Sequence, residues 1–182
     1  MATGLLVVDV QPAYGDYCDA IAAKVAQRIN NTVKPVTIMW VGEGFTRDSE
    51  ETVREYLREH GARPGCLAQA NFVEKDYGFF RGWMDQGVAE EDIIKVGTHM
   101  LRRELYSSED VDLEQLYLGD VPELPEIDQL SRPTFDDRRM LSLDAFETCG
   151  GGARECLAEI ELWLQMKGKP FTRLDSLVYG AC

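Results

Sequence analysis

The sequence predicts an α/β protein with a three-layer, doubly wound (Rossmann-like), mostly parallel sheet of about five to six strands and helices on both faces. Residues 4–10 (GLLVVDV) are a continuous apolar run, as in parallel strands that are buried on both sides. Further short apolar runs alternate along the chain with segments of helical period. This β-α-β order is typical of a parallel sheet covered by helices.

The first helix and the second strand follow directly. Asp16 can cap a helix that runs to about Asn30, and its inner face carries apolar residues at helical spacing: Ile21, Val25 and Ile29. Residues 35–41 (PVTIMWV) are expected to form the second buried strand.

The second helix and the third strand come next. A capping-box-like pair, Asp48 and Glu51, starts the helix, and Gly61 ends it. A loop over residues 63–70 then leads to a short third strand at 71–74.

The middle of the chain has a weaker pattern. Residues 78–86 are expected to be helical, and the state of the apolar segment 93–103 stays open. Residues 104–138 contain three prolines and many acidic residues without periodicity. Because a loop of this length is unusual inside a compact domain, we interpret it as an insertion, either a lid or an interface arm, in a single domain that spans residues 1–182.

The last third of the chain carries its most distinctive segment. A strand at 141–146 is followed by a glycine turn (150–152) and by an amphipathic helix with Cys156 in its first turn. The outward face of this helix is expected to hold polar residues: Glu159, Glu161 and Gln165. Residues 169–174 form a fifth strand, and 178–182 are a short tail.

The composition disfavours several classes of partner. A net charge of −13 repels nucleic acid and acidic membrane surfaces. No apolar run is long enough to span a membrane, and no signal-peptide pattern opens the chain. Five cysteines without regular spacing indicate free thiols in a reducing cytoplasm. We therefore expect a cytoplasmic protein with a small-molecule substrate or a protein partner.

Three reactive side chains are expected at one edge of the sheet. Asp9 ends the first strand, Lys75 follows the third, and Cys156 follows the fourth. A helix N-terminus favours a thiolate, a carboxylate can take the thiol proton, and a lysine beside both stabilises the anions. This set predicts a nucleophilic cysteine. The plain alternative is that Cys156 is a small buried cysteine without a chemical role. Cys149 is interpreted as an unreactive neighbour, and the alternative that it is the reactive thiol in place of Cys156 stays open.

Two segments resemble the isochorismatase-like cysteine hydrolases, the family that includes nicotinamidases and N-carbamoyl amidohydrolases. The run LLVVDVQ at residues 5–11, followed by Tyr14, is similar to the first strand of this family, which ends in Asp-x-Gln before an aromatic residue. Residues 150–180 resemble the segment in which a cysteine follows a glycine by six residues, before a helix, a glycine and an acidic residue; the matching residues are Cys156, Gly168 and Asp175.

The resemblance implies roles for individual residues. Asp9 would be the general base and Cys156 the nucleophile, and the backbone N–H groups of Gly152 and Cys156 would form an oxyanion hole beside a cis bond between Gly151 and Gly152. A catalytic lysine is implied, for which we prefer Lys75 to Lys95. The substrate pocket is expected to involve Gln11 and several aromatic residues: Tyr14, Trp40, Phe79, Phe80 and Trp83.

The sequence also departs from the family pattern. Ala153 stands where a threonine is usual, and Glu155 directly precedes the nucleophile. The histidines of the nicotinamidase metal site are missing, because the chain has only His60 and His99. We therefore expect no metal and no cofactor. The resemblance further implies a homo-oligomer, either a dimer or a tetramer.

Together these inferences predict a hydrolase that cleaves a small amide or a related C–N bond through a thioester on Cys156. Two alternatives stay open: a binding or regulatory protein whose degenerate site no longer turns over, and vinyl-ether hydrolysis of the isochorismatase type, which the resemblance implies uses no cysteine nucleophile. The substrate is not identified by the sequence; a ring carboxamide and an N-carbamoyl compound both fit.

Overall fold

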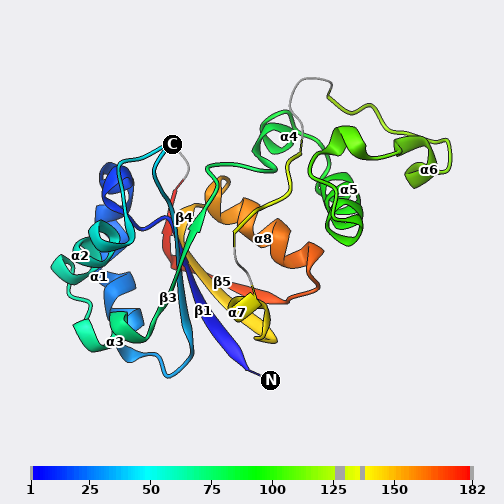
Figure 1. The fold of residues 1–182 in the computed structure, drawn as a ribbon. Coiled ribbons are helices and arrows are strands. Elements are labelled where there is room, and N and C mark those ends of the chain that lie inside the picture. Colours follow the sequence, from blue (N-terminus) through cyan, green and yellow to red (C-terminus); the bar gives the residue numbers. More distant parts are fainter. Residues whose placement is uncertain (1, 126–129, 136–137, 181–182) are drawn as a thin grey trace.

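A five-stranded parallel sheet forms the centre of the computed structural model, which describes residues 2–125, 130–135 and 138–180 (Figure 1). The strand order is β3-β2-β1-β4-β5, and every neighbouring pair is parallel. The strands are β1 (Thr3–Val8), β2 (Val36–Val41), β3 (Asn71–Lys75), β4 (Ala145–Gly152) and β5 (Phe171–Tyr179). The predicted α/β fold with a mostly parallel sheet is confirmed.

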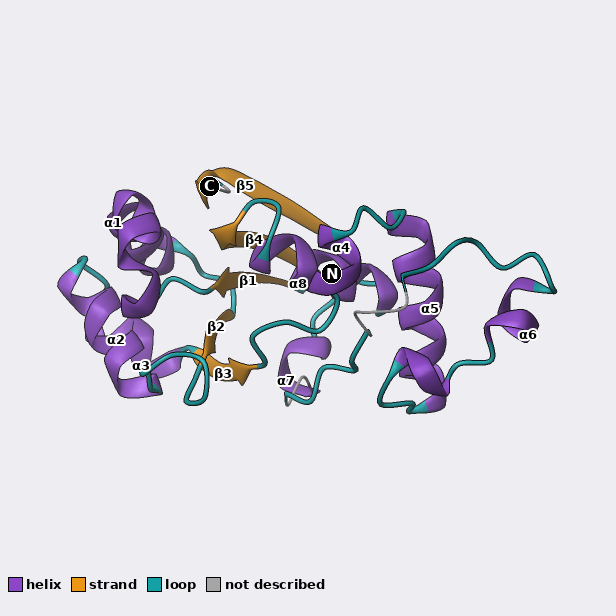
Figure 2. Ribbon diagram, turned by 90° about the horizontal axis from the view of Figure 1, so that it is seen from above, coloured by secondary structure: helices purple, strands orange, loops and turns teal. Residues whose placement is uncertain are grey.

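Helices lie against both sides of this sheet (Figure 2). On one side are α1 (Gly15–Asn31), α2 (Glu50–Glu59) and α3 (Pro64–Gln69). On the other side α8 (Cys156–Met166) lies nearest the strands. Four more helices lie on the same side as α8: α7 (Arg138–Leu141) near the sheet, and α4 (Arg81–Asp85), α5 (Glu90–Arg103) and α6 (Leu113–Tyr117) beyond α8. Two single 3-10 turns, η1 (Pro12–Tyr14) and η2 (Ser108–Asp110), complete the described elements.

The apolar run of β1 is explained by burial on both faces. Successive residues of a strand point to opposite sides of the sheet. Leu6 and Val8 join an apolar cluster with residues of α8, whereas Leu5 and Val7 pack in a second cluster that contains the predicted inner face of α1: Ile21, Val25 and Ile29. All four of these β1 residues are 0% exposed, so each of these positions needs an apolar side chain.

Several predicted boundaries are wrong. Residues 64–69 form α3 rather than a loop, because Pro64 occupies the first turn, where its fixed φ favours a helix. The fourth strand begins at Ala145, since residues 138–141 form α7, and it continues through the three glycines by pairing with β1 and β5. Residues 93–103 belong to α5, and β5 extends to Tyr179 in the expected tail.

The start of α2 also differs from the prediction. Ser49 is the N-cap residue, and it forms a reciprocal capping box with Thr52. Asp48 is instead buried, and its Oδ2 accepts hydrogen bonds from Gln11 Nε2 at 2.7 Å and from the N–H of Ala13 at 2.9 Å. Asp48 therefore ties η1 to the segment after β2.

Two of the three polar residues assigned to the outward face of α8 are buried. Glu159 is 1% and Glu161 is 3% exposed. Glu159 accepts hydrogen bonds from the N–H groups of Phe79 and Phe80, because the chain after β3 crosses over this helix. Glu161 accepts a hydrogen bond from Thr148 Oγ1 at 2.7 Å and pairs with Arg173 of β5. The prediction fails because partners distant in the sequence cover both carboxylates.

The described part of segment 104–138 packs on the α8 side of the sheet. Leu130 is fully buried in the apolar cluster there, and the ring of Phe135 lies 5.1 Å from that of Trp163. The N–H of Thr134 donates to Asp76 Oδ2 at 3.2 Å, just beyond the end of β3. The role of segment 104–138 as a lid or an interface arm stays a prediction. Residues 126–129 and 136–137 of this segment lie outside the described chain.

Gly150 and Gly151 adopt conformations and contacts that a larger residue could not. Gly150 has φ +88°, and a Cβ atom there would lie 2.2 Å from the carbonyl oxygen of Val8. Gly151 has φ +29°, and its Cβ would lie 2.9 Å from the backbone nitrogen of Leu157. The two glycines thus allow β4 to approach the end of β1 and the start of α8 closely.

The close approach of β4 to β1 predicts a large effect of Gly150→Ala. The substitution combines a positive φ with overlap against backbone, so we expect it to lower the free energy of unfolding by about 2–4 kcal/mol. Gly65→Ala is the matched control, because Gly65 lies in α3 with nothing within 4 Å of its Cβ position and should be neutral or slightly stabilising. Urea denaturation measures both, and equal effects would contradict this account of β4.

Candidate functional site

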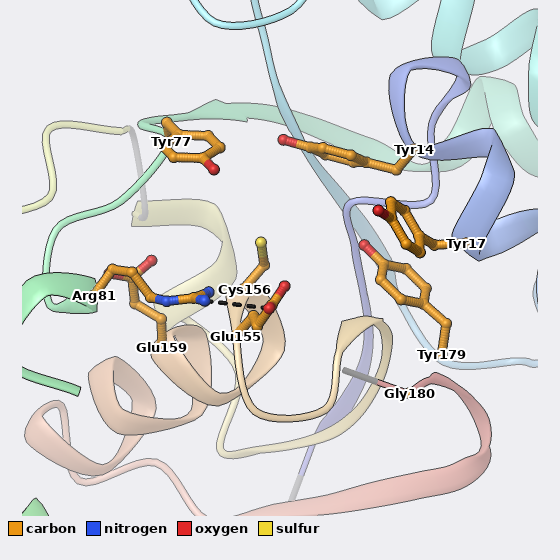
Figure 3. Close-up of a pocket in the computed structure, with 9 residues that line it drawn as sticks. All are labelled: Tyr14, Tyr17, Tyr77, Arg81, Glu155, Cys156, Glu159, Tyr179 and Gly180. Carbon is orange, nitrogen blue, oxygen red and sulfur yellow. Dashed lines mark ion pairs between the residues drawn. The ribbon is translucent and has the colours of Figure 1, made fainter. Parts of the chain in front are cut away.

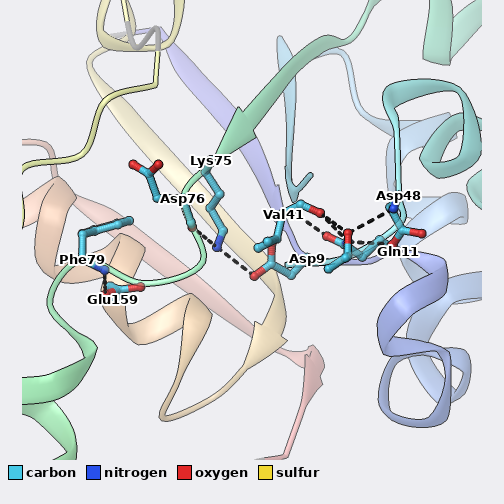
Figure 4. A network of polar contacts seen from close by, with 9 residues as sticks. Asp9, Gln11, Val41, Asp48, Lys75, Asp76, Phe79 and Glu159 are labelled. Atoms are coloured by element: carbon cyan, nitrogen blue, oxygen red, sulfur yellow. Dashed lines mark hydrogen bonds and ion pairs between the residues drawn. The ribbon is translucent and has the colours of Figure 1, made fainter. Parts of the chain in front are cut away.

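The C-terminal edge of the sheet brings the three predicted reactive residues together. Asp9 follows β1 directly, Lys75 is the last residue of β3, and Cys156 is the first residue of α8. Nζ of Lys75 lies 3.0 Å from Oδ2 of Asp9, and both side chains are 0% exposed (Figure 4). The strand order reverses at β1, which is where parallel α/β sheets place their ligands.

Asp9 has an unusual backbone conformation and an incompletely hydrogen-bonded carboxylate. Its φ is +51°, in the left-handed region that non-glycine residues rarely adopt. Among the described residues, neither carboxylate oxygen has a hydrogen-bond partner beyond the ion pair with Lys75. Backbone strain and an unsatisfied buried oxygen, Oδ1, both oppose folding, and such features are concentrated at functional sites.

The lysine beside Asp9 is Lys75 and not Lys95, the other candidate for a catalytic lysine. Burial alone would lower the pKa of Lys75, but the charges of Asp9 and Cys156 outweigh this effect, and the pKa is raised. The ammonium group therefore stays charged inside the protein. Lys95 lies on α5, where its Nζ is 3.8 Å from the centre of the Tyr117 ring.

Burial raises the pKa of the Cys156 thiol to about 12, and the charge of Asp9 adds to this effect while Lys75 opposes it. The expected easing of ionisation at the helix N-terminus is thus opposed here, because burial and a neighbouring carboxylate both favour the neutral thiol. Asp9 is the carboxylate adjacent to this thiol.

A cavity of about 240 Å³ opens over Cys156 (Figure 3). The sulfur points into it, and four phenol rings surround it: Tyr14, Tyr17, Tyr77 and Tyr179. Nη2 of Arg81 lies 3.2 Å from Oε1 of Glu155 on the wall beside the sulfur. The cavity therefore has aromatic walls, one ion pair and a thiol at its centre.

Most of the residues predicted to bind substrate lie elsewhere. Of the predicted aromatic residues, Tyr14 lines the cavity, whereas Trp40 is buried against Phe72 on the α1 side of the sheet. Three others belong to the apolar core on the α8 side: Phe79, Phe80 and Trp83. These four assignments are corrected because aromatic residues near strand ends fill the core here.

Gln11 is also removed from the predicted set. Its Nε2 donates to the carbonyl oxygen of Val41 at 3.0 Å and to Asp48, and its Oε1 accepts from the N–H of Val41 at 2.9 Å (Figure 4). Since these bonds occupy its amide, Gln11 fixes the end of β2 rather than contacting a ligand.

Sequence reasoning did not assign Tyr17, Tyr179, Tyr77 or Arg81 to the cavity. Tyr17 follows Tyr14 by one helical turn, and their rings line the same wall. Tyr77 and Arg81 follow Lys75 closely, and this proximity to the end of β3 was the available signal. Tyr179 ends β5, which the sequence predicted to stop at residue 174.

The backbone at the proposed oxyanion hole differs from the implied geometry. No cis peptide bond occurs among the described residues, so the cis bond expected between Gly151 and Gly152 is wrong. Gly152 is paired with Tyr179, and this strand pairing holds the end of β4 in line with β5. Cys156 begins α8, and first-turn N–H groups lack acceptors within their helix.

Cys149 lies away from the cavity. It is fully buried in β4 within the cluster on the α1 side, and burial raises the pKa of its thiol to about 12. It does not line the space that Cys156 faces.

The described residues contain no group of three or more His, Cys, Asp or Glu side chains arranged to hold a metal ion. His60 caps α2, with its Nδ1 2.8 Å from the carbonyl oxygen of Tyr56. None of the helices in the described ranges has the length and apolar character needed to cross a membrane.

Comparisons of the chain with protein-family models, curated proteins and solved structures find no match.

The buried ion pair predicts a large stability effect of Lys75→Met. The substitution leaves the Asp9 carboxylate without its cation, which should lower the free energy of unfolding by about 3–5 kcal/mol. Lys95→Met removes only an exposed cation–π contact and should cost at most about 1 kcal/mol. Urea unfolding of the two variants tests this difference; small and equal losses would show that the pair is not structurally important.

The raised thiol pKa predicts the pH dependence of labelling. With a pKa of about 12, the rate at which iodoacetamide labels Cys156 should still rise at pH 10. Asp9→Asn removes a charge that raises this pKa, so labelling at pH 8 should become faster. Peptide mass spectrometry measures both rates, with Cys66 as the internal reference. A wild-type rate that levels off below pH 8, or slower labelling in the variant, contradicts the coupling.

Proposed function

We propose that this protein is a cysteine hydrolase that cleaves a small-molecule amide or a related C–N bond through a thioester on Cys156. One observation supports this most strongly: a thiol faces a cavity of small-molecule size, next to a buried carboxylate that is paired with a buried lysine. Nucleophile, base and a group that orients the base are the three parts of covalent acyl transfer.

In the first half-reaction Asp9 takes the proton of Cys156 as the sulfur attacks the carbonyl carbon. The electron pair of the C=O bond moves to oxygen, and the N–H groups of Gly152 and Cys156 would stabilise the resulting anion. When the C–N bond breaks, protonated Asp9 gives its proton to the leaving nitrogen. The acyl group then remains on sulfur as a thioester.

In the second half-reaction Asp9 takes a proton from water, which attacks the thioester carbon. The C–S bond breaks, the acid leaves, and the sulfur recovers its proton from Asp9. Lys75 has no bond to form or break. Its fixed charge holds the carboxylate in place and stabilises the sulfur anion as it develops, which lowers the barrier to attack.

The cavity sets the size and character of the substrate. About 240 Å³ admits a small molecule. The four tyrosine rings suit a flat or ring-bearing compound, which a ring carboxamide and a small N-carbamoyl compound both satisfy.

A binding or regulatory function on the same fold is the second candidate. It is favoured by the Arg81–Glu155 ion pair beside the sulfur and by the neutral state of the resting thiol. Such a protein would bind small amides without releasing product. Vinyl-ether hydrolysis of the isochorismatase type would not use the Cys156 thiol as a nucleophile, so this function is less well supported.

Turnover of a panel of small amides tests the proposal. Benzamide, pyridine-3-carboxamide and N-carbamoylglycine are incubated with the protein, and ammonia release is measured. Cys156→Ser should reduce the rate at least about 10³-fold on any substrate that is cleaved, because the nucleophile is lost. Cys149→Ala, altered on the other face of the sheet, should stay within about twofold of wild type.

Hydrolysis that survives Cys156→Ser would rule out the thioester mechanism. Binding of an amide to the wild type without hydrolysis of any panel member would favour the binding function. The same panel applied to Asp9→Asn adds a second readout: its turnover should fall although its Cys156 labels faster with iodoacetamide, since a base is needed for catalysis but not for alkylation.

A further inference from the structure

The hydroxyl group of Tyr14 is buried and has no hydrogen-bond partner among the described residues. Its ring lines the cavity, and its oxygen points toward the space between Tyr77 and the Cys156 sulfur (Figure 3). Buried hydroxyl groups are almost always satisfied, because leaving one unpaired costs about 1–3 kcal/mol. An unpaired hydroxyl at a reactive thiol therefore requires an explanation.

We propose that the Tyr14 hydroxyl donates a hydrogen bond to an uncharged acceptor atom of the bound substrate, such as a carbonyl oxygen or a ring nitrogen. This inference rests on the proposed hydrolase function and gives the hydroxyl of Tyr14, a predicted pocket residue, a specific role in substrate recognition. It also narrows the substrate class to molecules that carry an uncharged acceptor atom beside the scissile carbon.

The electrostatics of the site favour this role. Burial raises the pKa of Tyr14, and the nearby charge of Asp9 raises it further, so the phenol keeps its proton and acts as a donor. The same charge repels an anionic acceptor. Oδ2 of Asp9 pairs with Lys75, whereas Oδ1 has no hydrogen-bond partner among the described residues. A donor next to an acceptor matches an amide, which presents a C=O and an N–H group together.

Tyr56 provides the contrast within the same chain. Its hydroxyl donates to Asp19 and lies 3.1 Å from the sulfur of Cys18, so its partners belong to the fold. Tyr56 is buried on the α1 side and does not line the cavity. A phenol whose partner is structural and one whose partner is a ligand should respond differently to loss of the hydroxyl.

The test compares Tyr14→Phe with Tyr56→Phe, using two reagents that alkylate Cys156. Iodoacetamide carries a neutral carbonyl acceptor, whereas iodomethane carries none. In Tyr14→Phe the iodoacetamide rate at Cys156 should fall about five- to tenfold, while the iodomethane rate and the melting temperature are not lowered. In Tyr56→Phe both rates should match wild type and the melting temperature should fall. Labelling is followed by peptide mass spectrometry relative to Cys66.

An iodoacetamide-to-iodomethane rate ratio in Tyr14→Phe that equals or exceeds that of wild type overturns the inference. So does a fall in melting temperature as large as that of Tyr56→Phe, which would make the hydroxyl structural. Asp9→Asn separates this failure from failure of the proposed function. If Asp9→Asn speeds labelling as expected while Tyr14→Phe has no effect, only the role of Tyr14 is lost; if Asp9→Asn leaves labelling unchanged, the coupled nucleophile and base fail.

Discussion

The buried ion pair between Asp9 and Lys75 is the constraint on which the site depends. The two residues end strands that are separated by β2, and neither is exposed. A single buried charge in this position would be strongly unfavourable, so the charge of each residue compensates that of the other. The contact also requires β1, β2 and β3 to stay in register. The pair also acts on Cys156: burial and the charge of Asp9 raise the pKa of its thiol, while the charge of Lys75 opposes this effect.

The glycines of β4 connect this pair to the nucleophile. Gly150 packs on Val8, the residue before Asp9, and Gly151 packs on Leu157, the residue after Cys156. Their positive φ angles and missing side chains bring the end of β1 and the start of α8 together. Asp9 itself has a left-handed backbone. Positive φ angles are thus concentrated where the carboxylate and the thiol lie close together, and backbone strain of this kind is common at functional sites.

The sequence predicted what topology alone determines. Asp9, Lys75 and Cys156 converge because the C-terminal ends of parallel strands share an edge, whatever fills the space around them. Of the aromatic cavity wall it predicted only Tyr14, because a periodic pattern cannot tell whether a residue such as Phe79 fills the core or faces a ligand. The neutral state of Cys156 and the burial of Glu159 also depend on covering residues from distant parts of the chain, so neither has a local signal.

The central claim is that Cys156 forms a covalent acyl intermediate with Asp9 as its base. Intact-protein mass spectrometry after rapid acid quenching of the protein with the amide panel tests it most directly. We predict a mass increase equal to the acyl group of a cleaved amide, located by peptide mapping at Cys156 and strongly reduced in Asp9→Asn. Product release without any adduct, or an adduct on another residue, would contradict the account.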